Sequence, residues 1–157
     1  MHNRLNILLG LVFLIVPLST FAQDSVLVIQ NLFPSGRLNA VIIADTLVSP
    51  SWKLGRRVYA LQKGGIFPQD KSIQIGNDRK LKLRAAYANE IEPVFGSEYN
   101  PMVFAYDQPG TTGRPPGTLF ILGGTNNELN LKNISISGFD ESNPYSGRRP
   151  SSRIRLD

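Results

Sequence analysis

The sequence predicts an all-β protein built as a parallel β-helix, or solenoid, behind a short N-terminal capping segment. Beyond Arg57, short apolar runs recur between linkers that are rich in Gly, Pro, Asn and Asp, as turns are. The Asn-Gly and Asp-Gly dipeptides typical of tight hairpins do not occur in the sequence. A change of alternation near Asn133 indicates a bent strand. Together these observations favour a parallel solenoid over an antiparallel sandwich or barrel.

The first 22 residues have the features of a signal peptide. Arg4 provides a basic start, an apolar run follows from Ile7 to Val16, and the sequence Thr20-Phe21-Ala22 offers a site for cleavage after Ala22. The alternative, a membrane-spanning helix, requires about 20 apolar residues, and this run is shorter. We therefore expect an exported protein at the cell surface, in the periplasm or outside the cell, with no membrane span once residues 1–22 are removed.

Residues 23–56 are predicted to form an N-terminal cap. A β-branched run at 26–30 indicates a strand. The spacing of Leu38, Val41, Ile42 and Leu47, near three and four residues, favours a short amphipathic helix over Leu38 to Thr46. A strand is the alternative there, because Val41, Ile42 and Ile43 are β-branched. We expect the helix to cover the open end of the first turn of the solenoid.

Residues 57–157 are predicted to form the first turns of the solenoid, called rungs. The predicted strands are 58–61, 72–75, 81–85, 92–95, 102–106, 119–122, 129–131 and 134–137, and the beginning of one more at 153–156. The linkers between them, such as 62–71, read as turns and loops.

The stretch ELNLKNISISGFD, residues 128–140, predicts a corner. Leu129 and Leu131 alternate with polar residues, and Ile134 and Ile136 alternate on the opposite parity. In a straight strand, such a slip would turn the second pair to the other face of the sheet. Both pairs stay inside if the chain bends at Asn133, since asparagine tolerates the left-handed conformation.

Composition excludes several kinds of site. Cysteine is absent, so the fold depends on a packed core rather than on disulfides. The only histidine is His2, which leaves with the signal peptide, so the mature chain has no imidazole for a Ser-His-Asp system or a metal. The formal net charge of +5 is spread along the chain, which indicates a solvated surface rather than a nucleic-acid interface.

Several motifs carry a resemblance to a known family. In order, they are GRLNAVIIADT, RRVYALQKGGIFP, KLKLRA, LFILGG and LNLKNISISGF. This order resembles the N-terminal part of right-handed parallel β-helix proteins of the pectate-lyase-like superfamily, as found in exported bacterial proteins. The resemblance implies a right-handed solenoid and an N-terminal portion of a longer one, because a solenoid needs several stacked rungs and a terminal cap.

The resemblance also indicates one catalytic motif. RRPSSR, residues 148–153, matches the R-x-P-x-x-R pattern of pectate lyases through Arg148, Pro150 and Arg153. In such enzymes an arginine of this motif removes a proton next to the uronate carboxylate, and calcium is the implied cofactor. The calcium-ligand cluster and the WiDH phrase of those enzymes are absent from this sequence, and a solvated loop is the alternative reading.

Other candidate residues are aromatic or acidic. Trp52 and Tyr145 lie in predicted loops, where they would stack on sugar rings or serve packing. Four acids are candidate calcium ligands, with ordinary surface acids as the alternative: Asp45, Asp107, Asp140 and Glu141.

Three functions remain open. The first is an exported β-helix that contacts polysaccharide, with no catalytic site identifiable in this chain. The second is the N-terminal part of a polysaccharide lyase or hydrolase whose active site lies beyond Asp157. The third is a non-catalytic, adhesin-like structural solenoid.

Overall fold

A computed structural model of the chain describes residues 24–49, 55–94, 98–106, 118–137 and 154–156. The predicted signal peptide, residues 1–22, lies outside the described residues. The elements are β1 (Ser25–Ile29), α1 (Leu38–Val48), β2 (Arg57–Leu61), β3 (Ile66–Gln69), β4 (Ile73–Ile75), β5 (Lys80–Ala85), β6 (Met102–Ala105), β7 (Phe120–Leu122), β8 (Glu128–Lys132), β9 (Ser135–Ser137) and β10 (Ile154–Leu156).

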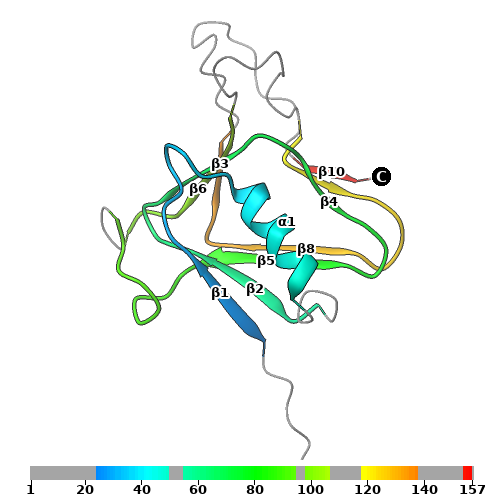
Figure 1. The fold of residues 1–157 in the computed structure, drawn as a ribbon, viewed down its shortest axis with the longest axis horizontal. Helices are drawn as coiled ribbons and strands as arrows, with labels where there is room; N and C mark the ends of the chain where they lie inside the picture. The colour runs from blue at the N-terminus through cyan, green and yellow to red at the C-terminus, as the bar shows by residue number, and fades with distance from the viewer. Residues whose placement is uncertain (1–23, 50–54, 95–97, 107–117, 138–153, 157) are drawn as a thin grey trace, which may run out of the picture.

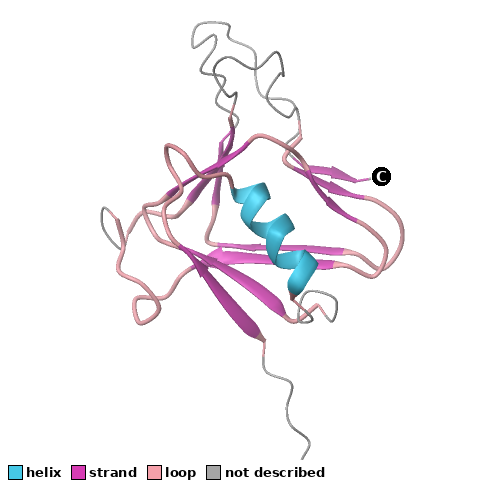
Figure 2. Ribbon diagram, viewed as in Figure 1, coloured by secondary structure: helices cyan, strands magenta, loops and turns pink. Residues whose placement is uncertain are grey.

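The described residues form a mostly β structure of three parallel sheets. The first sheet has the order β1-β2-β5-β8, the second β3-β6-β9 and the third β10-β7-β4. Every pairing between strands is parallel. The three sheets surround a common interior, and α1 lies across it at one end (Figures 1 and 2).

The order of the strands is cyclic. From β2 onward, each strand pairs with the strand three places later, as β2 does with β5 and β5 with β8. The chain therefore passes through the first, second and third sheets in turn, and it repeats this order from β2 to β10.

The core consists of residues in register on neighbouring strands. In the first sheet Tyr59 is aligned with Leu83, and Leu83 with Leu131. In the second sheet Phe67 is aligned with Val103. Tyr59, Phe67, Leu83 and Val103 are fully buried in one hydrophobic cluster with residues of the third sheet. Strand alternation explains this, because every second residue of β5 points inward and is buried.

Helix α1 confirms the helix predicted between Leu38 and Thr46. Leu38 and Ile42 are one turn apart, and both are completely buried in the core cluster. The helix ends where the backbone N–H of Ser49 donates to the carbonyl of Asp45 at 2.8 Å. Its buried residues belong to the core cluster, and the helix lies across one end of the interior (Figure 2).

Asn133 has a φ of 55°, which is the left-handed conformation that the change of parity predicts. The chain leaves the first sheet at Lys132 and enters the second sheet at Ser135. The four apolar residues around this point all pack against the core cluster, namely Leu129, Leu131, Ile134 and Ile136. The bend thus keeps both pairs on the inside.

Two successive turns, at 76–79 and 123–127, lie on one another. Asn77 Oδ1 accepts the backbone N–H of Thr125 at 2.7 Å, and Asn126 Nδ2 donates to Asp78 Oδ1 at 2.9 Å. A Cβ atom at position 124 would lie 1.8 Å from Asn77 Oδ1, and Gly124 has a φ of 92°. Both facts require glycine there.

Two strand predictions were wrong. Residues 92–94, the described part of the predicted strand 92–95, form no strand. Conversely, β3 lies within a segment predicted to be a turn, and it contains Pro68. A proline is tolerated because β3 is an edge strand of its sheet, so a missing N–H can face away from the partner strand.

Candidate functional site

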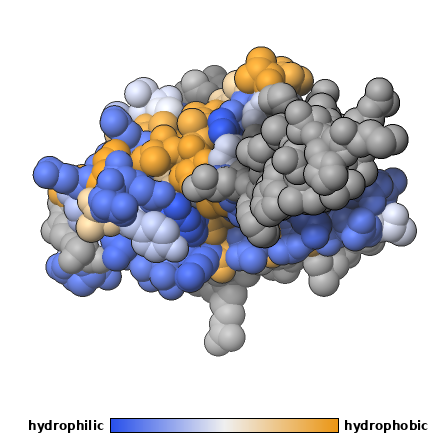
Figure 3. Space-filling view, turned by 90° about the horizontal axis from the view of Figure 1, so that it is seen from below, coloured by the Kyte–Doolittle hydropathy of each residue, from blue (hydrophilic) through white to orange (hydrophobic). Residues whose placement is uncertain are grey.

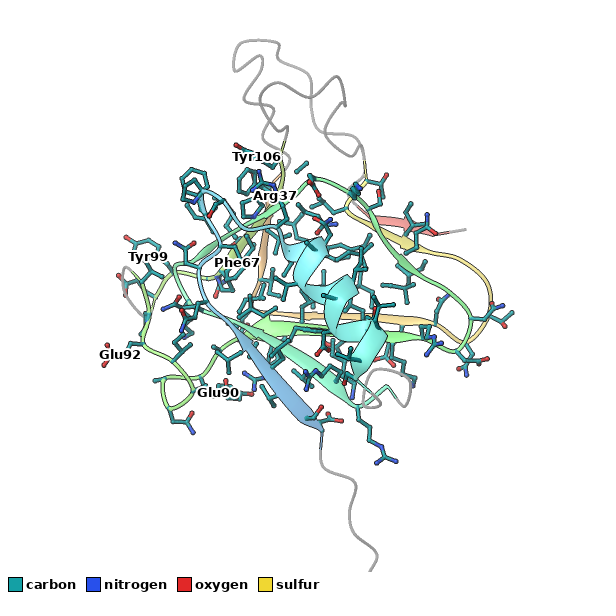
Figure 4. All side chains as sticks on the ribbon, viewed as in Figure 1. Arg37, Phe67, Glu90, Glu92, Tyr99 and Tyr106 are labelled. Atoms are coloured by element: carbon teal, nitrogen blue, oxygen red, sulfur yellow. The ribbon has the colours of Figure 1, made fainter. Side chains whose placement is uncertain are left out.

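The strongest candidate site is the connection between β5 and β6, residues 86–101, of which 86–94 and 98–101 are described. Its sequence contains Glu90, Glu92 and Glu98 but no lysine or arginine. Tyr87 and Tyr99 are 52% and 58% exposed. Figure 4 shows Tyr99, Glu92 and Glu90 on one side of the molecule, away from Arg37 and Tyr106. We call the described part of this segment, residues 86–94 and 98–101, the tyrosine corner.

Tyr87 is held by an ion pair at the end of β5. The Arg84 guanidinium donates to both carboxylate oxygens of Glu90, at 2.7 and 2.5 Å, and this carboxylate also accepts the backbone N–H of Tyr87 at 2.8 Å. The same guanidinium lies 4.1 Å from the centre of the Tyr87 ring, in cation–π contact. Ring, guanidinium and carboxylate therefore hold one another in place.

The electrostatics of this pair follow from the hydrogen bonds. Those from Arg84 lower the pKa of the Glu90 carboxyl below its ordinary value, and the backbone N–H of Tyr87 contributes in the same direction. The bonds to Glu90 raise the pKa of Arg84 in turn. Glu90 is thus ionised at neutral pH and cannot serve as a general acid.

The rest of the tyrosine corner is anchored to the turn between β2 and β3. The backbone N–H of Gly64 donates to the Tyr99 carbonyl at 2.9 Å, and that of Val94 donates to the Lys63 carbonyl at 2.9 Å. Gln62 Nε2 donates to the Glu92 carbonyl at 2.6 Å. These bonds attach the segment at both ends, so that the two exposed tyrosines are presented on a fixed support.

A second polar cluster lies beneath α1. Arg57 donates to the Asp45 carboxylate from both Nε and Nη2, and the Tyr59 hydroxyl donates to Asp45 Oδ2 at 3.0 Å. Burial, followed by the hydrogen bond to Asp45, raises the pKa of the Tyr59 hydroxyl. The same carboxylate raises the pKa of Arg57. Because Asp45 belongs to α1 and its partners to β2, this cluster attaches α1 to the first sheet.

Arg37 occupies a third polar position, at the start of α1. Its guanidinium lies 4.1 Å from the centre of the Tyr106 ring, and its Nη1 donates to the carbonyls of Pro34 and Gly36. Its Nε is 3.9 Å from Asp70 Oδ2. These contacts join α1 to the second sheet, where Tyr106 follows β6, so this arginine has a structural role.

Most of the site residues proposed from the sequence lie outside the described residues. These are Arg148, Arg153, Trp52 and Tyr145, together with Asp107, Asp140 and Glu141. Asp45, the remaining acid, is bonded to Arg57 and Tyr59 rather than placed on an open surface. Within the described ranges, no group of three or more His, Cys, Asp or Glu side chains is arranged to hold a metal ion.

Sequence reasoning missed the tyrosine corner. The available signal was a long connection in which two tyrosines accompany three acids without a base. The prediction of a strand at 92–95 concealed it, because the segment was divided between a strand and two short loops. The pairing of Arg84 with Glu90 depends on the chain turning back after β5, which the residue types alone do not indicate.

Comparison with models of known families, with curated proteins and with solved structures gave no match. In the part of the chain that the structure describes, no helix combines the length and the apolar character needed to cross a membrane.

Proposed function

We propose that this chain forms the first rungs of a right-handed parallel β-helix in an exported protein, and that its tyrosine corner contacts polysaccharide. The cyclic passage through three parallel sheets supports the solenoid, because each circuit adds one strand to each sheet. The helix across one end supports a capped beginning.

The observation that carries the polysaccharide proposal is the pair of half-exposed tyrosines on an anchored segment. Aromatic side chains combine a large apolar surface with a polar tip, which suits a ligand whose ring faces are apolar and whose edges carry hydroxyls. Tyr87 is already stacked against Arg84 on one side, so little side-chain freedom is lost on binding. Exposed carboxylates of Glu92 and Glu98 provide hydrogen-bond acceptors for sugar hydroxyls on the same segment.

Charge favours a neutral polysaccharide over an acidic one. The segment carries three acids and no base. Among the described residues, Glu90 is the one of these acids that is paired with an arginine. A uronate chain would bring further carboxylates toward Glu92 and Glu98, and like charges repel. This differs from the acidic substrates that the pectate-lyase resemblance implies.

The test is binding of the exported chain to neutral polysaccharides, such as xylan and dextran, and to pectate, measured by affinity electrophoresis. We expect retardation by at least one neutral polymer and weaker retardation by pectate. Tyr87→Ala and Tyr99→Ala should each weaken binding about tenfold, since an aromatic contact of about 1.4 kcal/mol corresponds to that factor. Tyr99→Phe keeps the ring and should retain most of the affinity.

Phe33→Ala is the matched control, because Phe33 is an exposed aromatic residue outside the tyrosine corner. Its binding should equal that of the unaltered chain. Retardation that survives loss of both tyrosines would contradict the assigned surface. No retardation by any polymer would contradict the proposal and favour the adhesin-like structural solenoid. Release of unsaturated uronate from pectate, abolished by Arg153→Ala, would favour the lyase instead.

A further inference from the structure

The capped end of the molecule presents a surface formed by one continuous segment, residues 25–48. It contains β1, the connection that follows it, and α1. β1 is the outermost strand of the first sheet, and α1 covers the core beside it (Figure 1). We call the outer side of this segment the end face.

The outward side of α1 is apolar although it faces solvent. Leu38 and Ile42 are turned inward, whereas Leu47 and Val48 are 78% and 79% exposed and Ile43 is exposed as well. Val26 of β1 is also an exposed large hydrophobic residue. Val28 of β1 and Val58 of β2 are partly exposed. Figure 3 shows an apolar region next to a hydrophilic one on the side of the molecule seen from below. Clustered exposure of this kind marks interaction surfaces.

β1 also has a free edge. Within the described part of the chain it pairs with β2 alone. The Ser25 N–H donates to the Arg56 carbonyl and the Ile29 carbonyl accepts the N–H of Gln62, so alternate residues turn their backbone groups toward β2. The N–H and C=O groups of Val26 and Val28 therefore point to the other edge, where they are available to a further strand.

The end face is almost free of charge. Residues 25–48 contain only Arg37 and Asp45 as charged residues, and these are paired with Asp70 and Arg57, respectively. The whole chain carries a formal charge of +5, so two copies have a net repulsion for one another. Two copies can therefore bring their end faces together without opposing unpaired charges from residues 25–48.

We propose that the end face binds a second copy of this chain, forming a closed two-fold dimer. With the two-fold axis at Leu27, β1 pairs with the β1 strand of the second copy in antiparallel orientation. Val26 then lies opposite Val28 of the second copy, and each such pair exchanges two hydrogen bonds. All four free backbone groups of Val26 and Val28 are satisfied, and the exposed side of α1 is removed from water.

The symmetry of the contact limits its extent. Because the same surface meets itself, the contact closes at two copies and does not extend into a fibre.

The test is the mass of the exported chain in solution, measured by sedimentation equilibrium over a range of concentrations. We expect a reversible monomer–dimer equilibrium. Leu47→Lys should shift it at least tenfold toward monomer, because a charge would be placed in an apolar contact. Val28→Pro should do the same by removing an outward N–H while leaving the N–H groups that pair with β2. A monomer at all concentrations, or open-ended assembly, would overturn the proposal.

Asn130→Lys is the control, because it adds a charge to an exposed residue of β8, at the opposite edge of the first sheet. It should dimerise like the unaltered chain. Amide exchange provides a readout that does not depend on altered residues: protection of the Val26 and Val28 amides should rise with protein concentration, while the Leu27 amide stays protected throughout. Dimerisation that is unaffected by Leu47→Lys and leaves the Val26 and Val28 amides unprotected would overturn the assigned face.

Discussion

Residues in the left-handed backbone conformation lie at the corners where the chain passes from one sheet to the next. Asp78, Asn126 and Asn133 are the described non-glycine residues with positive φ, at 56°, 54° and 55°. Asn and Asp tolerate this conformation because their short polar side chains bond locally. At Asp78 and Asn126 the two side chains also bond to each other, so one turn supports the next.

Asn133→Ala should lower the free energy of unfolding by about 1 to 2 kcal/mol, because a Cβ without a polar partner is strained in the left-handed region. Asn133→Gly removes that strain and should cost less than the alanine variant. Urea denaturation followed by circular dichroism would measure both. Equal stabilities of the alanine and glycine variants would show that the conformation at residue 133 does not limit the fold.

At the scale of an element, helix α1 has apolar residues on both its inward and its outward side. Its inward side contributes Leu38 and Ile42 to the core, and Asp45 attaches it to Arg57 and Tyr59 of β2. Its outward side is equally apolar at Ile43 and Leu47, so hydrophobic pattern alone does not distinguish the buried side from the exposed one. The orientation is decided by the position of Asp45, whose carboxylate has charged and hydroxyl partners only on the inward side.

Ile42→Ala and Ile43→Ala form a matched pair that tests this orientation. The first should lower the free energy of unfolding by about 2 to 5 kcal/mol, since it leaves a cavity beneath α1. The second removes methyl groups from an exposed side chain and should change the stability of the monomer by less than about 0.5 kcal/mol. Thermal unfolding at low protein concentration provides the comparison. Similar losses for the two variants would mean that α1 does not lie on the core through Ile42.

Aligned residues of β2, β5 and β8 form three stacked layers in the first sheet. Their burial decreases from the middle layer, on β5, to the last described layer, on β8. Leu83 lies between Tyr59 and Leu131 in the first sheet and is 1% exposed. Leu131, in register with it on β8, is only partly buried. Layers stacked in register depend on their neighbours, so a central layer is covered on two sides and an outer layer on one.

Leu83→Ala should therefore destabilise the chain by about 2 to 5 kcal/mol. Leu131→Ala, the same substitution in the aligned position, should cost about half as much. The two variants differ only in the layer that they affect, and guanidinium denaturation would compare them. A greater loss for Leu131→Ala would contradict the stacking order β2-β5-β8.

Much of the local structure could be predicted from the sequence because it depends on neighbours along the chain. Alternation of apolar residues located β5 and β8, the spacing of Leu38 and Ile42 favoured a helix, and the parity change pointed to Asn133. Strand β3 was missed because Pro68 and the glycines before it are local signals for a turn, while its edge position in the sheet is not local.

By itself, the sequence determined which residues can face the interior, where the chain can bend, and that no disulfide stabilises it. Tertiary structure alone decided which strands pair, that Asp45 meets Arg57 and Tyr59, and that Tyr87 is held between Arg84 and Glu90. The physical reason is separation along the chain. Side-chain alternation and backbone conformation are properties of adjacent residues, whereas ion pairs, ring contacts and strand register depend on the lengths and paths of the connections between them.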